Sequence, residues 1–277
     1  MKLLRWGERG AEKPGVLDAD GRIRDLSSIV GDIDGAMLGR LSEIPEIEAL
    51  PLVPGTPRLG ACVGSVGKLV CVGLNYADHV AEAGAPMPVE PVVFFKATSA
   101  IAGPNDDVVL PKGSQKVDWE VELGLVIGHQ VAYADEAQAR AAIVGYCVVN
   151  DLSERAWQME RGGQWVKGKS ADGFAPIGPW LVTADNVRDD SALHLWLDVD
   201  GRRYQDSSTS QMIFKPAFIV SYLSQFMSLQ PGDVICTGTP PGVGLGLKPP
   251  VYLRAGQLVR LGIEGLGVQT QRIVAHG

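Results

Sequence analysis

Short apolar runs, separated by turn-forming residues, cover most of the chain from residue 68 onward. Runs of this length bounded by Gly, Pro, Asn and Asp are typical of β-strands. The pattern predicts strands at residues 69–73, 91–95, 107–110, 119–127, 145–149, 193–199, 233–237, 258–264 and 268–274. The main part of the chain is therefore expected to be rich in strands.

Two segments have a helical pattern instead. Residues 134–144 are rich in alanine and charge, and residues 216–229 begin with a proline and carry apolar side chains at helical spacing. The stripe expected to face the core consists of Ile219, Tyr222, Leu223, Phe226 and Met227. Because strands and helices do not alternate regularly, we predict an α+β, β-rich fold built on mixed or antiparallel sheets.

The N-terminal part of the chain has a weaker pattern. Its expected elements are β-like pieces at residues 15–18 and 22–26, joined by a turn, and a weakly helical stretch at residues 33–50. At residues 51–60, prolines and glycines then interrupt any helical or strand-like periodicity of hydrophobic residues, which is typical of a linker. We therefore predict a small N-terminal α+β domain with its linker at residues 1–60 and a main domain at residues 61–277.

The composition is that of an ordinary globular protein, with 45% hydrophobic and 21% charged residues. A chain of 277 residues has room for one large domain and a small additional module. No apolar run approaches the roughly 20 residues that a membrane span needs, and the first apolar segment is too short for a signal peptide. We therefore expect a cytoplasmic protein that has no membrane partner.

Charge and cysteine content exclude further classes. The chain has 25 Lys and Arg against 32 Asp and Glu, a net charge of −7, so it lacks the basic footprint of a nucleic-acid binder. Its four cysteines, Cys62, Cys71, Cys147 and Cys236, lie in apolar surroundings without CxxC spacing or a nearby His. We expect buried free thiols rather than a zinc site.

Two glycine motifs resemble nucleotide-binding sequences but lie in the wrong context. Residues 163–170 match the GxxxxGK[ST] phosphate-binding loop, which needs a buried strand before it and a helix after it. A polar, helix-like segment precedes this match, and Pro176 and Pro179 follow it. The glycine-rich residues 242–246 run into prolines instead of a helix. A phosphate-loop nucleotidase is therefore only a rival hypothesis.

Three carboxylates form the first candidate for chemistry. Glu120 and Glu122 are separated by one residue in a predicted strand, so both side chains lie on the same face. Asp151 follows another apolar strand, whose end would direct it to the same point. A solvated strand face is the alternative explanation of the two glutamates. Three carboxylates without a His or Cys cluster favour Mg²⁺ or Mn²⁺ over zinc.

A histidine and a glutamate form the second candidate. After the strand at residues 69–73, Asn75 is expected to cap a short helix that Gly84 ends. His79 and Glu82 are three residues apart and would lie on one side of this helix. A lone histidine is more often structural than catalytic. A glutamate beside the ring would, however, orient it and raise its basicity, as a general base that activates water requires.

Six segments, in this order, resemble the fumarylacetoacetate hydrolase family. They are residues 73–82 (GLNYADHVAE), 91–96 (PVVFFK), 118–124 (DWEVELG), 150–158 (NDLSERAWQ), 167–170 (KGKS) and 232–240 (GDVICTGTP). The resemblance covers about residues 64–275. It implies that the main domain is catalytic, that its fold is a mixed β-sandwich roll, and that the chain forms a homodimer.

The same resemblance implies a metal centre and a catalytic base. A divalent ion, Mg²⁺ or Mn²⁺, would be held by Glu120, Glu122 and Asp151. A dyad of His79 and Glu82 would activate a water molecule. The implied reaction is hydrolysis of a C–C bond in a small-molecule 2,4-diketo acid, in which water attacks C4 and cleavage of C3–C4 releases pyruvate.

Four more polar residues complete the expected site. The resemblance implies a catalytic lysine at Lys169, which makes the apparent phosphate loop a coincidence. Lys169 and Lys96 would offset the negative charge of the carboxylates and the substrate. Gln158 and Thr239 would hydrogen-bond the substrate carboxylate or the developing oxyanion.

Within the family, residues 2–7, 12–21, 24–27 and 157–165 resemble bacterial 2,4-diketo-3-deoxy-L-rhamnonate and L-fuconate hydrolases. This resemblance implies a diketo sugar acid as substrate, with pyruvate and L-lactate as products and a place in L-rhamnose catabolism. Leu74 stands where many mammalian-type acylpyruvases have Arg, so their acyl preference does not transfer. Another acylpyruvate or fumarylpyruvate hydrolase, oxaloacetate decarboxylation, hydroxydienoate isomerisation and non-catalytic binding of a sugar acid are the alternatives.

Overall fold

The computed structural model describes residues 1–84 and 86–277. The strands of its largest sheet are β1 (Lys2–Trp6), β2 (Lys13–Leu17), β3 (Ile23–Asp25), β4 (Leu69–Gly73), β5 (Val92–Lys96), β6 (Ile101–Ala102), β9 (Val121–Ile127), β10 (Ile143–Asn150), β12 (Ala175–Thr183) and β15 (Val234–Cys236). They lie in the order β3-β2-β1-β12-β10-β9-β15-β4-β5, with β6 paired to β12. The sheet is mixed, because β15 pairs with β4 in parallel and with β9 antiparallel.

A second sheet packs against the first. Its strands are β7 (Val108–Val109), β13 (His194–Val199), β14 (Arg202–Ser208), β16 (Leu258–Ile263) and β17 (Gly267–Val274), and they lie in the order β14-β13-β16-β17-β7. Strands β13, β16 and β17 contact β9, β10 and β12 of the large sheet. A small two-stranded sheet joins β8 (Val117–Asp118) to β11 (Ser153–Glu154). The predicted β-rich fold with mixed sheets is confirmed.

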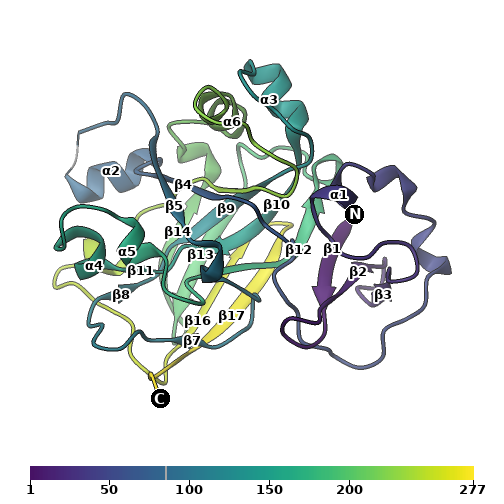
Figure 1. Cartoon of the computed structure of the whole chain (residues 1–277). Coiled ribbons are helices and arrows are strands. Elements are labelled where there is room, and N and C mark those ends of the chain that lie inside the picture. Colours follow the sequence, from purple (N-terminus) through teal and green to yellow (C-terminus); the bar gives the residue numbers. More distant parts are fainter. Residues whose placement is uncertain (85) are drawn as a thin grey trace.

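Short helices surround these sheets, as Figure 1 shows. They are α1 (Gly35–Leu38), α2 (Ala77–Ala83), α3 (Glu136–Ala142), α4 (Arg155–Met159), α5 (Val166–Lys169) and α6 (Pro216–Ser224). The 3₁₀ helices are η1 (Leu41–Glu43), η2 (Ile47–Ala49), η3 (Thr98–Ala100), η4 (Ala184–Asn186), η5 (Thr209–Gln211) and η6 (Gly244–Gly246). Within the described residues, none of these helices has both the length and the apolar character that crossing a bilayer requires.

The position of each strand explains its hydrophobic pattern. Every residue of β9 is buried, and so is every residue of β10 except Val144. Both strands lie inside the large sheet and are covered on both faces. Strand β17 instead alternates buried and more exposed residues, as a strand with one covered face does. The continuous apolar runs therefore mark the centre of the molecule, where the candidate carboxylates lie.

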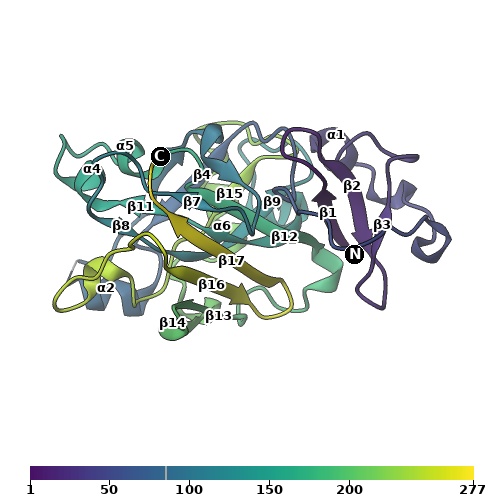
Figure 2. The same cartoon turned by 90° about the horizontal axis from the view of Figure 1, so that it is seen from below.

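The N-terminal strands extend the large sheet. Lys2 and Leu3 of β1 pair with Val182 and Leu181 of β12, and Figures 1 and 2 show β1, β2 and β3 at one side of the main body. The domain division at residue 60 stays a prediction. The weakly helical stretch expected at residues 33–50 contains α1 and two 3₁₀ helices instead of one continuous helix.

All nine predicted strands overlap observed ones, and β4 has the predicted bounds. Strands β1, β12 and β14 and the two-residue strands β6, β8 and β11 were not predicted. Strand β12 contains Pro176, Gly178 and Pro179, which usually count against an inner strand. Strand β14 is polar because it lies at the edge of its sheet, where one side meets solvent.

The helix predictions need three corrections. Helix α3 ends at Ala142, because the next residues already belong to β10. Helix α6 ends at Ser224, so Phe226 lies beyond it and is 66% exposed, although Ile219 and Leu223 of the predicted stripe are buried. The cap of α2 is Tyr76 rather than Asn75.

Asn75 has a different role from the predicted cap. Its side-chain amide donates to the carbonyl groups of Phe214 and Thr237 and accepts the N–H of Phe214, so it ties the start of α2 to the core. Gly84 ends α2 as expected, with a positive φ of 60° that a glycine adopts without steric cost. The four cysteines are buried free thiols, as the sequence predicts.

Candidate functional site

The three candidate carboxylates come together at neighbouring ends of β9 and β10. Glu122 lies opposite Val149 in this antiparallel pair, and the N–H of Asp151 bonds to the carbonyl of Glu120 at 2.9 Å. Candidate ligand oxygens of Glu120, Glu122 and Asp151 all lie within 4.8 Å of one another. All three residues are buried, so the alternative of a solvated strand face was wrong.

Buried cations neutralise two of these carboxylates. The Lys169 ammonium lies 2.7 Å from Glu120 Oε2 and 2.7 Å from Asp151 Oδ2. The Lys96 ammonium lies 2.5 Å from Asp151 Oδ1, and an Arg155 nitrogen lies 2.7 Å from Glu120 Oε1. Because these groups are withdrawn from water, each charge depends on its partners.

The two glutamates have opposite pKa shifts. Burial opposes ionisation of Glu120, but Lys169 and Arg155 outweigh it and lower its pKa to about 2. Burial raises the pKa of Glu122 well above its usual value, and the negative charges of Asp151 and Glu120 raise it further. Glu122 thus has no cation of its own to balance its charge among the described residues.

This donor set fits a hard divalent cation. One candidate ligand oxygen from each of the three carboxylates lies within 4.8 Å of the other two. Among the described residues, Glu122 accepts one hydrogen bond, at 2.8 Å from the N–H of Gly238. Oxygen ligands from Asp and Glu are those that Mg²⁺ and Mn²⁺ prefer. The residues present are therefore suited to hold such an ion, and a divalent metal site is what the arrangement supports.

The apparent phosphate loop serves packing. Helix α4 precedes the motif where a strand would be required, and the Ser170 hydroxyl accepts the N–H of Ala97. A Cβ at Gly168 would lie 2.4 Å from the Glu154 carbonyl oxygen, so this glycine lets α5 pack closely on its neighbour. Lys169 points to the carboxylates described above, which explains the motif without a nucleotide.

The predicted His–Glu pair forms on α2. His79 Nδ1 lies 3.2 Å from Glu82 Oε2, and both side chains are partly exposed. The Glu82 carboxylate also accepts the N–H of Gly242, at 3.1 Å from Oε1. Its place is thus set both by its own helix and by the loop at residues 242–246.

A cavity of about 760 Å³ joins this pair to the carboxylates. The predicted site residues that line it are His79, Glu82, Glu120, Glu122, Gln158, Lys169 and Thr239. These residues come from five separate parts of the chain. The volume is in the range of small-molecule sites, so one bound substrate would reach both the carboxylates and the His–Glu pair.

Asp151 and Lys96 lie behind the cavity wall. The Lys96 ammonium is fully buried and bonds to Asp151 and to the carbonyl of Leu152, at 2.9 Å. Lys96 is therefore placed to hold Asp151 in position, whereas the sequence analysis predicts that it contacts the substrate directly. Thr239 reaches the cavity, but its hydroxyl donates to the Val121 carbonyl.

Arg155 is the residue that the sequence analysis missed. Its guanidinium contacts Asp118, Glu120 and Gln158, and it lines the cavity. The contact with Gln158 uses that side chain's oxygen, at 3.0 Å, so its NH₂ group remains available to a ligand in the cavity. The sequence feature that could have identified Arg155 was its place in the segment 150–158, four residues after the predicted metal ligand Asp151.

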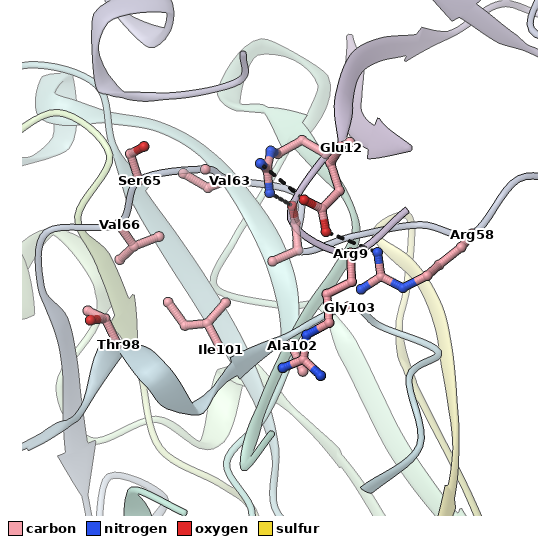
Figure 3. A pocket seen from close by; sticks show the side chains of 13 residues that line it. Arg9, Glu12, Arg58, Val63, Ser65, Val66, Thr98, Ile101, Ala102 and Gly103 are labelled. Atoms are coloured by element: carbon pink, nitrogen blue, oxygen red, sulfur yellow. Dashed lines mark hydrogen bonds and ion pairs between the residues drawn. The ribbon is translucent and has the colours of Figure 1, made fainter. Parts of the chain in front are cut away.

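A second cavity, of about 300 Å³, lies between the N-terminal strands and the main body. Figure 3 shows arginines along its wall, with the Glu12 carboxylate paired to Arg58. Arg58 also pairs with Asp106 at 2.6 Å, and Arg5 pairs with Asp32 at 2.6 Å. Arg5 and Arg58 are thus paired within the protein, whereas Arg9 makes no ion pair to the described residues. The ion pair of Arg58 with Asp106 connects the N-terminal residues to the main body.

A buried carboxylate cluster beside a His–Glu pair is what a metal-dependent enzyme of small organic acids requires. The family model of the fumarylacetoacetate (FAA) hydrolase C-terminal region matches residues 68–274. The chain therefore belongs to the fumarylacetoacetate hydrolase family and is an enzyme. A Burkholderia multivorans protein is 64% identical over 277 residues, covers 98% of each chain, and has only a provisional name as a hydrolase.

Solved structures agree with this assignment. Fumarylacetoacetate hydrolase from Exiguobacterium antarcticum is 34% identical, with a TM-score of 0.89 over 100% of both chains. 2-Hydroxyhepta-2,4-diene-1,7-dioate isomerase from Mycobacterium marinum is 33% identical, with a TM-score of 0.77 over 100% of this chain and 99% of that one. Maleylpyruvate hydrolase from Sphingobium sp. SYK-6, in complex with manganese(II) and pyruvate, is 26% identical, with a TM-score of 0.82 over 100% of both chains.

Proposed function

We propose that this enzyme hydrolyses the C3–C4 bond of a 2,4-diketo acid and releases pyruvate and a second carboxylic acid. The observation that supports this most is the single cavity that contains Glu120, Glu122, His79 and Glu82. A structural relative that holds manganese(II) and pyruvate at 26% identity supports the same chemistry. The reaction consumes one water molecule, whose OH group is added to C4 while C3 gains a proton.

Three carboxylates, of Glu120, Glu122 and Asp151, would hold a divalent cation, Mg²⁺ or Mn²⁺. When bound, this cation would polarise the C2 carbonyl and stabilise negative charge on the pyruvate half of the substrate. The substrate carboxylate would lie at the same end of the cavity, where Lys169 offsets part of the negative charge. This arrangement orients C4 toward His79 and Glu82.

The base would act on water at C4. His79, oriented by Glu82 at 3.2 Å, takes a proton from the water molecule as its oxygen attacks C4. The free NH₂ group of Gln158 and the guanidinium of Arg155 would donate to the oxyanion or to the substrate carboxylate. Cleavage of C3–C4 then leaves pyruvate as an enolate, which takes up a proton at C3.

Within this class, the sequence resemblance supports 2,4-diketo-3-deoxy-L-rhamnonate, which would give pyruvate and L-lactate in L-rhamnose catabolism. The proposal includes a homodimer acting in the cytoplasm. Light scattering of the purified protein tests the dimer. Short N-terminal segments and residues 157–165 carry the resemblance to this sugar-acid branch, so the substrate has to be tested directly.

The decisive experiment supplies a panel of 2,4-diketo acids with Mg²⁺ or Mn²⁺ and follows pyruvate with NADH and lactate dehydrogenase. The panel contains the deoxyrhamnonate and deoxyfuconate derivatives, fumarylpyruvate and a simple acylpyruvate. Pyruvate from at least one of these diketo acids supports the proposal, and the ratio of kcat/KM values identifies the substrate. Absence of pyruvate from every compound would refute hydrolysis.

Isomerisation is the second candidate, because the Mycobacterium marinum isomerase is 33% identical over the whole chain. An isomerase would move a double bond of a hydroxydienoate without consuming water. The same panel therefore includes a 2-hydroxyhepta-2,4-dienedioate and oxaloacetate, followed by absorbance and by released CO₂. A change in absorbance without pyruvate would favour isomerisation.

A further inference from the structure

Asp118 is a buried carboxylate that lies outside the cavity wall and outside the candidate metal ligands. It accepts four hydrogen bonds. Its Oδ1 atom bonds the N–H of Gly244 at 2.7 Å and of Trp119 at 2.8 Å. Its Oδ2 atom bonds the N–H of Leu245 at 2.9 Å and Nε of Arg155 at 2.8 Å. One side chain thus holds a loop and an arginine together.

Those two partners lead to different halves of the site. Arg155 contacts Glu120 at 2.7 Å, on the side of the candidate metal ligands. The 242–246 loop contacts Glu82 through the N–H of Gly242, on the side of the proposed base. Trp119, next to Asp118, also donates its Nε1–H to the Gly242 carbonyl at 3.1 Å. Asp118 therefore lies where the two halves are connected.

The glycines of this loop permit its close approach. A Cβ on Gly242 would lie 1.9 Å from the Tyr204 carbonyl oxygen, and its φ of +97° also favours glycine. A Cβ on Gly244 would lie 1.9 Å from the Val251 carbonyl oxygen. A Cβ on Gly246 would lie 2.9 Å from the Glu82 carboxyl group. The glycines of residues 242–246 thus let the loop backbone lie against the Glu82 carboxylate.

We propose that Asp118 is a positioning residue that fixes the Glu82 carboxylate relative to Glu120 by anchoring the 242–246 loop and Arg155 at once. The inference rests on the proposed function for its catalytic consequence and on the hydrogen bonds alone for the anchoring. Attack on C4 requires the activated water to lie at a set distance from a substrate held at the carboxylates. A displacement of about 1 Å in such a geometry costs on the order of 100-fold in rate.

Asp118→Asn tests this with almost no change in shape. The new NH₂ group would face two donors, from Leu245 and Arg155, so the anchor at Oδ2 is replaced by repulsion. We expect kcat to fall about 10- to 100-fold. KM and the affinity for Mn²⁺ should change less than about 3-fold, because Arg155 keeps its contacts with Glu120 and Gln158. Calorimetric titration with MnCl₂ measures that affinity without turnover.

A double variant separates positioning from general damage. If Asp118 acts through Glu82, adding Asp118→Asn to Glu82→Gln should lower kcat by less than about 3-fold more. Losses that multiply would overturn the proposal. Wild-type kcat in Asp118→Asn would overturn it as well.

Asp233 provides a matched control. It is equally buried and accepts the N–H groups of Lys68 and Gln230, each at 2.8 Å, but it lies outside the cavity wall. Asp233→Asn should lower the urea midpoint as Asp118→Asn does and leave kcat within about 2-fold of wild type. An equal loss of kcat in both variants would show that the effect is only structural.

Hydrogen exchange tests the anchor without any substrate. In the wild-type enzyme, the amides of Gly244 and Leu245 should be among the slowly exchanging ones, because a buried carboxylate accepts both. In Asp118→Asn they should exchange at least about 10-fold faster, while the strand amides of β9 keep their rates. Fast exchange in the wild type would refute the anchoring even if Asp118→Asn does not fold. Slow exchange without diketo-acid turnover would leave the anchor standing and refute the proposed function.

Discussion

Replacing Glu82 by glutamine isolates the proposed base from the metal ligands. The Glu82→Gln amide keeps an oxygen that can accept the Gly242 N–H, but it removes the negative charge 3.2 Å from His79. Loss of a positioned general base typically lowers the rate by 10² to 10⁴, or about 3 to 5 kcal/mol of transition-state stabilisation. We expect kcat to fall in this range. Binding of metal and substrate should be retained, because the cavity and its carboxylates are unchanged.

Oxalate provides the control for binding, because it chelates like pyruvate and has no C4 for water to attack. Its calorimetric affinity in the presence of Mn²⁺ should be nearly unchanged in Glu82→Gln and in His79→Ala. Since the two residues act as one unit, the double variant should be little slower than the slower single variant. Fully additive losses of kcat, or loss of oxalate binding with His79→Ala, would refute the assignment of this histidine as the base.

Three further predictions address the metal, the nucleotide motif and the pH dependence of stability. Glu122→Ala should abolish turnover and should abolish Mn²⁺ binding as measured by calorimetry. EDTA should inactivate the wild type reversibly. Full activity of the metal-free enzyme would contradict the mechanism. ATP and GTP should neither bind nor be hydrolysed, which calorimetry at micromolar nucleotide checks. Burial opposes ionisation of Asp18, but the N–H of Arg22 and the guanidinium of Arg24 outweigh it and lower its pKa from 3.8 to about 2. This carboxylate therefore stabilises the fold above pH 3.8 and loses that effect as the pH falls toward 2. The urea midpoint of Asp18→Asn should accordingly depend less on pH between these two values than the midpoint of the wild type does.

Glu122 is the informative ligand to change because of how the carboxylates are partnered. Asp151 pairs with two buried lysines. Asp151→Ala would leave Lys96 without an ion-pair partner and Lys169 with Glu120 alone, which would destabilise the fold. Glu122 makes no ion pair to the described residues, so its removal relieves repulsion instead. Loss of Mn²⁺ binding without loss of stability is thus expected at this position alone of the three.

The carboxylate site was predictable because it depends on local rules. The period of two in a strand places Glu120 and Glu122 on one face, and a strand end places Asp151 near them. The helical spacing of His79 and Glu82 is equally local. Their meeting across one cavity depends on strands far apart in the chain, and only the family resemblance indicated it.

Long-range packing decided what the sequence analysis missed. Nothing in the sequence near Lys96 shows that its ammonium ends behind the cavity, against Asp151. Arg155 contacts Asp118, 37 residues earlier in the chain, and this pairing has no local pattern. Strand β12 contradicts propensity because β1 and β10 on either side provide its partners, which outweigh the cost of its prolines.

The charges of the site explain why a metal-binding carboxylate cluster also contains lysines. The candidate metal ligands and the buried charged groups linked to them by ion pairs are Asp118, Glu120, Glu122 and Asp151 against Lys96, Arg155 and Lys169. Ionised, the four carboxylates exceed the three cations by one negative charge, and a divalent ion reverses this to one positive charge. A substrate with one carboxylate would then make the site neutral.

We therefore expect Lys169 to serve the substrate more than the ion. Burial opposes its charge, but Asp151 and Glu120 raise the pKa of its ammonium, so it stays protonated. Lys169→Met removes one positive charge from a site that has to admit an anion. We expect KM for the diketo acid to rise and kcat to fall, while the affinity for Mn²⁺ increases because Glu120 and Asp151 lose a competing cation. Weaker Mn²⁺ binding in this variant would show that the lysine supports the ligands, and that the charge argument is wrong.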